Sequence, residues 1–315
     1  MEINYDANTK MYGGYPVIRK QGAVSPNCES SPFVWRFEDG ERLMRLELYD
    51  RSIRTGFAEK SYAIIRDCES GRILSRVGEG CYYFSFYQEN GVAYVLCTNA
   101  PCGTSSSEIM IFESRDLVNW RGRSLLKRPG WLYYNTSLAK GPDGYMLALE
   151  ASEPEEAVGP YPYTVFFASS KNLRDWSFLP DELGFSKERY TGAPFMRYSR
   201  GWYYLIVGLL LPCERFGSYI FRTKDFKTWE TGLYNPIMMP DNDDRKISPE
   251  AHDIDDELRE KIATAFAVCD SDYDLCDYKG KTVISYNVGN QLGFAYIAQA
   301  IYDGSSDDFF EAFFR

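Results

Sequence analysis

The chain has 315 residues, of which 44% are hydrophobic and 16% aromatic, with 25 tyrosines and 20 phenylalanines. This composition provides a large core and favours strands, because aromatic side chains pack well on pleated sheets. The formal net charge of −10 repels phosphate backbones and anionic headgroups, so we expect no nucleic-acid partner and no membrane partner. The polar N-terminus and the lack of an apolar run of about 18 residues predict no signal peptide and no spanning helix, hence a cytoplasmic location.

The eight cysteines are scattered without a CxxC pair, and most stand beside apolar or aromatic residues. We therefore expect reduced, buried thiols rather than a disulfide framework. The chain has one histidine, which argues against a zinc site, so no metal ligand and no required cofactor are predicted.

Five units of one pattern follow one another along the chain. Each has an apolar strand, a glycine turn and a second strand, which is a hairpin signal. The strands and their glycines are 32–35 with Gly40, 83–86 with Gly91, 137–139 with Gly144, 194–196 with Gly201, and 273–275 with Gly280. The glycines are 51, 53, 57 and 79 residues apart, which predicts blades at approximately 28–76, 77–130, 131–180, 190–235 and 268–315.

A second motif recurs in the middle three units, at 114–120, 170–176 and 223–229, and reads Ser/Thr-x-Asp/Asn-Leu/Phe-x-x-Trp. Its tryptophans, Trp120, Trp176 and Trp229, are 56 and 53 residues apart. We interpret it as a turn held by Ser and Asp side chains, followed by a tryptophan that packs under the next blade. Together the two patterns predict an all-β fold, a five-bladed β-propeller in one domain spanning 1–315; a β-sandwich with accidental repeats is the alternative.

The longest spacing places an insertion at 241–267, between blades four and five. Ser248-Pro249-Glu250 is typical of a helix start, and the segment from Asp255 to Phe266 has a helical rhythm, so a short helical insertion is expected. The segment 306–309 is interpreted as a weak copy of the turn motif that ends the fifth unit.

The repeated turn and the Pro-led inner strands resemble the furanosidase-like superfamily of five-bladed glycoside hydrolases, which includes families 43 and 117. The resemblance covers the chain from Cys28 to Phe314. It implies a site at the mouth of the central channel, where three acidic groups meet. In the family 43 pattern an Asp precedes the Pro of blade one and a Glu stands two residues before the Pro of a later blade, whereas this chain has Ser31 and Gly192 there.

Other carboxylates near the starts of inner strands are therefore the candidates for acid/base chemistry, which glycoside cleavage needs. Glu29 stands three residues before Pro32. In blade five, Asp270, Asp272 and Asp274 alternate, so we expect all three on one side of an extended strand. Crowding of like charges raises at least one pKa, and Asp272 and Asp274 are the predicted acid/base or substrate-orienting pair.

His252, within the insertion, is a further candidate, since the resemblance to family 117 implies a histidine in place of the family 43 glutamate and histidine can act as a general acid. A surface position is the alternative. The resemblance also implies that the channel could hold a structural cation, for which Asp272 and Asp274 could supply ligands.

Further residues are candidates for substrate binding. Asn135 and Glu150 of blade three could bond sugar hydroxyls, and Arg197 or Lys140 could pair with site carboxylates or an anionic substrate. Aromatic residues could stack on a sugar ring, although blade packing is the alternative for each of them. These are Tyr82, Tyr83, Trp131, Tyr133, Tyr134, Tyr190 and Trp202.

The sequence thus predicts a glycoside hydrolase that cleaves a terminal glycosidic bond of an oligosaccharide. Two alternatives stay open: a carbohydrate-binding propeller without catalytic activity, and a glycoside phosphorylase on the same fold. The sequence does not indicate an oligomeric state.

Overall fold

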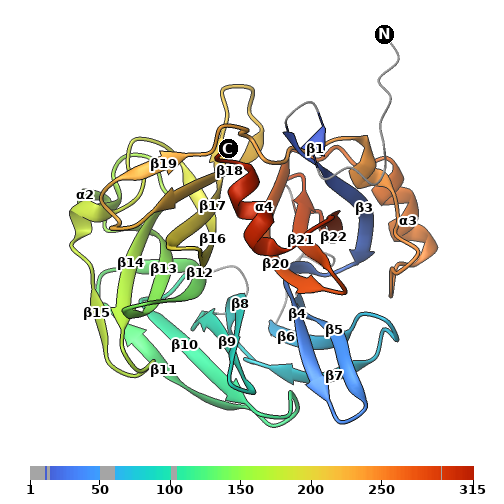
Figure 1. Ribbon diagram of the computed structural model, residues 1–315, viewed down its shortest axis with the longest axis horizontal. Helices are drawn as coiled ribbons and strands as arrows, with labels where there is room; N and C mark the ends of the chain where they lie inside the picture. Colours follow the sequence, from blue (N-terminus) through green and yellow to red (C-terminus); the bar gives the residue numbers. More distant parts are fainter. Residues whose placement is uncertain (1–10, 13–14, 50–60, 101–104, 292) are drawn as a thin grey trace.

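Five antiparallel sheets of four strands surround a central axis in the computed structural model, which describes residues 11–12, 15–49, 61–100, 105–291 and 293–315 (Figure 1). From the axis outward, the strands of blade one are β4 (Cys28–Phe37), β5 (Gly40–Tyr49), β6 (Tyr62–Asp67) and β7 (Ile73–Val77). Those of blade two are β8 (Tyr82–Glu89), β9 (Val92–Thr98), β10 (Glu108–Ser114) and β11 (Arg121–Lys127). The strands of blade three are β12 (Leu132–Gly141), β13 (Gly144–Glu153), β14 (Thr164–Ser170) and β15 (Trp176–Phe178). Those of blade four are β16 (Thr191–Ser199), β17 (Trp202–Leu210), β18 (Phe216–Thr223) and β19 (Trp229–Thr231). The predicted five-bladed propeller is confirmed.

Blade five is built from both ends of the chain. Its strands are β20 (Cys269–Tyr278), β21 (Lys281–Gly289), β22 (Ala295–Tyr302) and, outermost, β3 (Ile18–Ser25). The predicted range 268–315 therefore omits the outer strand, which comes from the N-terminal segment and pairs Ile18 with Tyr302. A small hairpin of β1 (Met11–Tyr12) and β2 (Tyr15–Pro16) precedes β3.

The turn motif joins the third and fourth strands of blades two, three and four. In blade two, the hydroxyl of Ser114 accepts from the backbone N–H of Leu117 at 3.0 Å, and Leu117 has a φ of 61°. Trp120 donates from its indole nitrogen to the Ser75 hydroxyl of β7 at 3.2 Å, so the tryptophan contacts the preceding blade. The prediction that it packs under the next blade is wrong, because this hydrogen bond joins it to blade one, which precedes its own blade.

The insertion between blades four and five contains the 3-10 turn η2 (Asn242–Arg245) and helix α3 (Asp256–Ala263), which confirms the predicted helical insertion. The side chain of Asp255 caps α3 by accepting from the N–H of Leu258 at 2.8 Å. No helix begins at Ser248, whose N–H instead donates to the carbonyl of Ala23 in β3. The segment 306–309 is likewise no turn motif, because it opens helix α4 (Ser306–Ala312), which buries Phe309 and Phe310.

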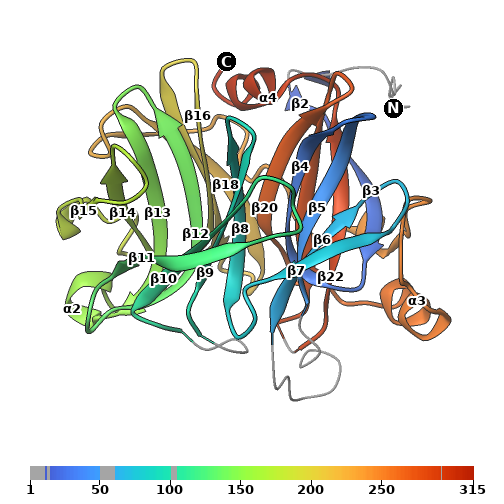
Figure 2. The ribbon, with the colours of Figure 1, turned by 90° about the horizontal axis from the view of Figure 1, so that it is seen from below.

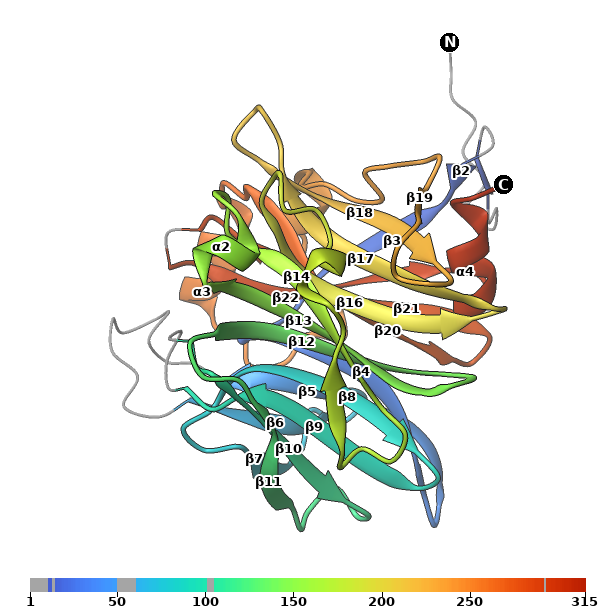
Figure 3. The same ribbon diagram turned by 90° about the vertical axis from the view of Figure 1, so that its left-hand side faces the viewer.

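The two faces of the propeller differ. Helix α4 lies on one face, whereas α2 (Glu155–Val158), between β13 and β14, and α3 lie toward the other (Figures 2 and 3). The inner strands begin at this second face, which we call the mouth face (Figure 3). The 3-10 turn η1 (Asp181–Leu183) lies between blades three and four. Among the described residues no helix is long and apolar enough to cross a membrane.

One buried lysine joins the N-terminal strand to the insertion and to the inner strand of blade five. The ammonium of Lys20 lies 2.7 Å from carboxylate oxygens of both Asp244 and Asp270, and donates to the carbonyl of Met239 at 2.8 Å. Burial lowers the pKa of Lys20, but the charges of Asp270 and Asp244 outweigh it and raise that pKa above its usual value. Lys20 therefore stays charged and closes the ring of blades.

We expect Lys20→Met to destabilise the fold by about 3–5 kcal/mol, because it leaves two buried carboxylates without their cation. Urea unfolding at neutral pH measures the change. Lys246→Met is the matched control, since Lys246 is exposed and, in the described part of the chain, paired only with Asp243. This substitution should cost less than about 0.5 kcal/mol. A loss of under about 1 kcal/mol in Lys20→Met would show that the cluster is not needed for closure.

Candidate functional site

The inner strands share a bulge near their start. In four of the five strands one residue at the bulge has a left-handed backbone: Glu29 (φ 46°), Tyr83 (φ 57°), Ala193 (φ 51°) and Asp272 (φ 53°). A bulge inserts an extra residue into one strand and re-aims its side chains. Glu29 and Asp272 are therefore placed at equivalent points of the adjacent blades one and five.

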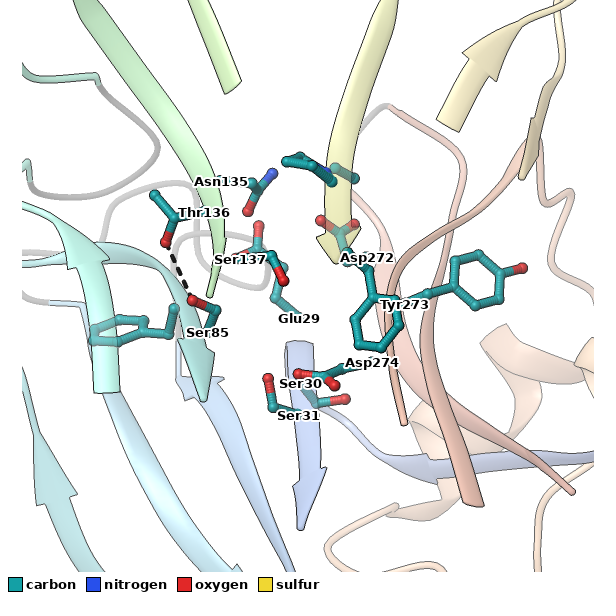
Figure 4. Close-up of a pocket in the computed structure, with 14 residues that line it drawn as sticks. Glu29, Ser30, Ser31, Ser85, Asn135, Thr136, Ser137, Asp272, Tyr273 and Asp274 are labelled. Carbon is teal, nitrogen blue, oxygen red and sulfur yellow. Dashed lines mark hydrogen bonds between the residues drawn. The ribbon is translucent and has the colours of Figure 1, made fainter. Parts of the chain in front are cut away.

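These two carboxylates face one cavity at the axis, and Asp274 lines it as well (Figure 4). The cavity measures about 30 Å³, room for one or two water molecules. Asn135 of β12 and Ala193 of β16 are also among the residues that line it. A sugar ring is too large for this space, so a substrate would lie at the mouth above the cavity.

Asp272 and Asp274 have different surroundings. Asp274 forms an ion pair with Arg197 of β16 at 2.7 Å, and its carboxylate also accepts from the N–H of Leu275. Asp272 accepts only from the Ser271 hydroxyl, at 2.6 Å, among the bonds seen in the described part of the chain. Burial raises the pKa of both carboxyls, opposed by Arg197 at Asp274 and by Ser271 at Asp272. Of these two carboxyls, only Asp274 is paired with a cation that favours its ionised form; Asp272 has no such partner among the described residues.

The expectation that Asp270 shares a side with these two is wrong. The register changes between Ser271 and Asp274, and this bulge breaks the alternation of side chains. Asp270 points instead to Lys20, at 2.7 Å. Asp270 therefore takes part in the closure of the blades, whereas Asp272 and Asp274 line the cavity.

Glu150 of β13 lies directly behind the cavity wall and is 3% exposed. One carboxylate oxygen, Oε2, accepts from the N–H of Ala193 at 2.8 Å and from the amide of Asn135 at 3.0 Å. Burial raises the pKa of Glu150 to about 7; these two hydrogen bonds oppose the rise and the charge of Asp272 adds to it. Because Oε2 is taken by two donors, the proton belongs on Oε1.

Glu47 of β5 provides a contrast, because it also stands opposite the inner-strand bulge, in blade one. It is fully buried, and its carboxylate accepts from the Arg66 guanidinium at 3.0 Å and from Ser25 and Asn27 at 2.7 Å. Glu150 has no cation within ion-pair distance among the described residues, so no cation opposes the rise of its pKa by burial.

Tyrosines extend from the cavity across blades two to four. Ring centroids are 5.3 Å apart for Tyr83 and Tyr134, 4.6 Å for Tyr134 and Tyr163, and 5.4 Å for Tyr163 and Tyr190. Burial raises the pKa values of Tyr83 and Tyr190, and the nearby charge of Glu150 adds to both. These rings, which we call the tyrosine arc, present neutral hydroxyls beside the carboxylates. Tyr83, Tyr134 and Tyr190 were among the aromatic candidates named from the sequence.

Several predicted residues do not line the cavity, among them Trp131 and His252. Trp131 is 4% exposed, covered by the Arg128 guanidinium at 3.9 Å from its ring centroid and by Phe166, so it has no free face for a sugar. His252 lies at the seam of blades five and one, where its Nε2 donates to the carbonyl of Cys68 at 2.9 Å. It does not line the cavity.

The comparisons with known proteins agree with this geometry at the level of fold. No protein-family model matches the sequence, and no curated protein matches it. Solved structures do match: a protein described as a glycoside hydrolase has 14% identity and a TM-score of 0.60, covering 91% of this chain and 93% of its own. The chain has the five-bladed propeller fold of glycoside hydrolases.

Two further structures are informative. An α-L-arabinofuranosidase from Fusarium graminearum, bound to an iminosugar inhibitor, has 12% identity and a TM-score of 0.59, covering 92% of this chain and 98% of its own. The native arabinanase of Bacillus subtilis has 13% identity and a TM-score of 0.52, covering 90% and 96%. Identities this low show a shared fold and leave the activity to be argued from the site.

Gly192 stands where the family 43 pattern has a glutamate, and its surroundings leave little room for a side chain. A Cβ added to Gly192 would stand 3.2 Å from Oε1 of Glu150 and 3.1 Å from the hydroxyl of Tyr190. A side chain at position 192 would thus begin in tight contact with the Glu150 carboxyl of the neighbouring blade, which would have to shift by a few tenths of an ångström. Glu150 reaches this place from β13, the second strand of its blade.

The channel cation implied by the resemblance finds no suitable ligand set. Asp274 is engaged by Arg197, and no group of three or more His, Cys, Asp or Glu side chains suited to a metal occurs among the residues that the structure describes.

Tyr163 is a site residue that sequence reasoning missed, since it lies in an irregular loop with no repeat to locate it.

We expect Glu150→Gln to be more stable than the wild type at pH 8 and equally stable near pH 4.5. Glu150 has a folded-state pKa raised from 4.5 to about 7, so the stability it contributes is complete below pH 4.5 and is lost as pH rises to 7. The difference at pH 8 should approach ~3 kcal/mol. Urea unfolding at both pH values measures it, with the exposed Glu153→Gln as control; equal stability at pH 8 would contradict a protonated Glu150.

Proposed function

We propose that the protein is a glycoside hydrolase that cleaves a terminal glycosidic bond at the mouth of the channel. The observation that carries the proposal is the convergence of Glu29 and Asp272, from adjacent blades, on one cavity. Glycoside cleavage needs one carboxyl that donates a proton and one carboxylate that activates water or attacks the sugar.

Asp272 is assigned as the proton donor. It faces the cavity, burial raises its pKa, and within the described ranges no cation pairs with it. Its proton passes to the glycosidic oxygen as the bond to the anomeric carbon breaks. A water molecule adds to that carbon, and its proton returns to a carboxylate of the site, which restores the starting charges.

Glu29 is assigned as the carboxylate that acts on water or on the anomeric carbon, since it enters the same cavity from the neighbouring blade (Figure 4). Glu150 is a positioning residue. It fixes Asn135 and Ala193 in the wall, and when ionised its charge holds the proton on Asp272 more firmly.

The tyrosine arc supports a carbohydrate ligand. Tyrosine rings and hydroxyls contact both the apolar face and the hydroxyls of a sugar. A phosphorylase is less favoured, because the two basic side chains expected near the site are engaged: Arg197 with Asp274 and Lys140 with Glu89 at 2.8 Å.

A carbohydrate-binding propeller without catalysis is the second candidate. Ser31 and Gly192 stand where the family 43 pattern has acids, and the cavity of about 30 Å³ admits water but no sugar ring. This candidate requires binding without bond cleavage, so one assay that follows both binding and product release separates it from the hydrolase.

The first test is Asp272→Asn against a panel of aryl glycosides, including arabinofuranosides and xylosides. We expect turnover by the wild type and a loss of about 10²–10⁴-fold in kcat for the variant, since the proton donor is removed. Glu29→Gln should lose activity similarly, and the exposed Glu153→Gln should not. Unchanged turnover in Asp272→Asn would refute the assignment; wild-type binding without release would favour the second candidate.

The pH profile tests Glu150 separately. With Asp272 as donor, kcat/KM falls as pH rises through its pKa, and an ionised Glu150 keeps that pKa high. Glu150→Gln removes the charge, so the alkaline limb should move to lower pH while the variant remains folded. An alkaline limb that does not move would show that Glu150 has only a structural role.

A further inference from the structure

A second cavity, of about 280 Å³, lies where the insertion meets blades four and five. Arg215, from the loop between β17 and β18, and Arg245, at the end of η2, line it together with Phe266. Tyr296, which is 1% exposed, also contributes to the lining. This volume is just below the range of about 300–1,000 Å³ typical of small-molecule sites, and suits one sugar unit.

Among the described residues, both arginines have hydrogen-bond donors without a partner. Arg245 donates from Nε to the carbonyl of Ala265 at 2.9 Å, which fixes the side chain and leaves its two terminal nitrogens available. The guanidinium of Arg215 lies 5.3 Å from the ring centroid of Phe266. Within the described ranges neither arginine lies within ion-pair distance of an acidic side chain. A guanidinium fixed in this way is arranged to bind a carboxylate through two parallel hydrogen bonds.

The acidic residues of the same wall do not compensate these arginines. Asp244 contacts Lys20 and accepts from the hydroxyl of Tyr286, and Asp241 lies 3.2 Å from Lys20. Both carboxylates are thus turned to the lysine that closes the blades. Lys20 is shared by Asp241, Asp244 and Asp270, but these carboxylates are not within ion-pair distance of Arg215 or Arg245 among the described residues. Both guanidiniums are therefore available to a ligand.

Phe266 adds an apolar surface, because 65% of it is exposed although it stands at the cavity. An exposed ring beside two guanidiniums matches a molecule that has both an apolar ring face and a carboxylate. We propose that this cavity binds a uronate, a sugar that carries a carboxylate. The carboxylate pairs with Arg245 and Arg215, and the sugar ring packs on Phe266.

The cavity is close enough to the channel for both to contact one oligosaccharide. Ala267 lines it and leads directly into β20, which carries Asp272 five residues later, a distance of at most about 17 Å along an extended chain. The rings of Tyr190 and Phe216, 5.2 Å apart, connect the tyrosine arc to the residue that follows Arg215. The statement that this uronate is part of a substrate rests on the proposed function. The statement that a uronate binds in this cavity is independent of it.

Calorimetric titration with glucuronic acid and galacturonic acid, and with glucose and galactose as neutral counterparts, tests the proposal without any need for turnover. We expect both uronates to bind the wild type and to bind Arg215→Ala/Arg245→Ala at least about tenfold more weakly. Arg259→Ala is the matched control, because this exposed arginine on α3 has the same charge and does not line the cavity. Asp272→Asn should bind uronates as the wild type does.

Several outcomes would overturn the proposal: no uronate binding by the wild type, equal binding by the double variant, or loss of binding in Asp272→Asn alone, which would place the ligand at the channel. Inorganic phosphate and sulfate form a further arm, and tighter binding of either would identify a simple oxyanion site. If the double variant does not fold, Arg245→Lys, which keeps the charge and loses the planar fork, should still weaken uronate binding.

Discussion

The bulge near the start of each inner strand is the constraint on which the candidate site depends. It places residues with a left-handed backbone at the axis, at a cost of about 1–3 kcal/mol for each non-glycine residue. Regular pairing on both sides holds the strain in place, as in β20, where the pairs Ser271–Asn287 and Asp274–Ser285 flank Asp272. Two of the strained residues are the carboxylates that face the cavity.

Burial without a compensating cation raises the pKa of a carboxyl, and Glu150 is in this situation. Glu47 and Glu150 stand at equivalent positions of blades one and three, but Arg66 neutralises only Glu47. The buried carboxylate with a cation joins two blades, and the one without it has a pKa near neutrality. Perturbed pKa values without a structural partner are typical of functional sites, which favours blade three as part of the chemistry.

The sequence predicts the fold well because its signals are local and repeated. Hairpin glycines and the Ser/Asp turns act within a few residues, so their spacing alone reveals five units. The outer strand 18–25 lacks any such signal, since it pairs with residues almost 300 positions away. The orientation of Asp270 was likewise missed, because alternation along a strand does not reveal a bulge. Glu150 was among the predicted site residues, but its contacts with Asn135 and Ala193 depend on the packing of two blades.

Closure of the ring and the candidate chemistry share one strand. In β20, Asp270 is held by Lys20 of the N-terminal strand and Asp274 by Arg197 of blade four. Asp272 lies between these two ion pairs and, among the described residues, has no cation of its own. The flanking pairs fix the backbone and neutralise the neighbouring charges, so the protonation of Asp272 is governed mainly by burial. A loosened N-terminal strand would therefore weaken the fold and change the acidity of the proposed proton donor together.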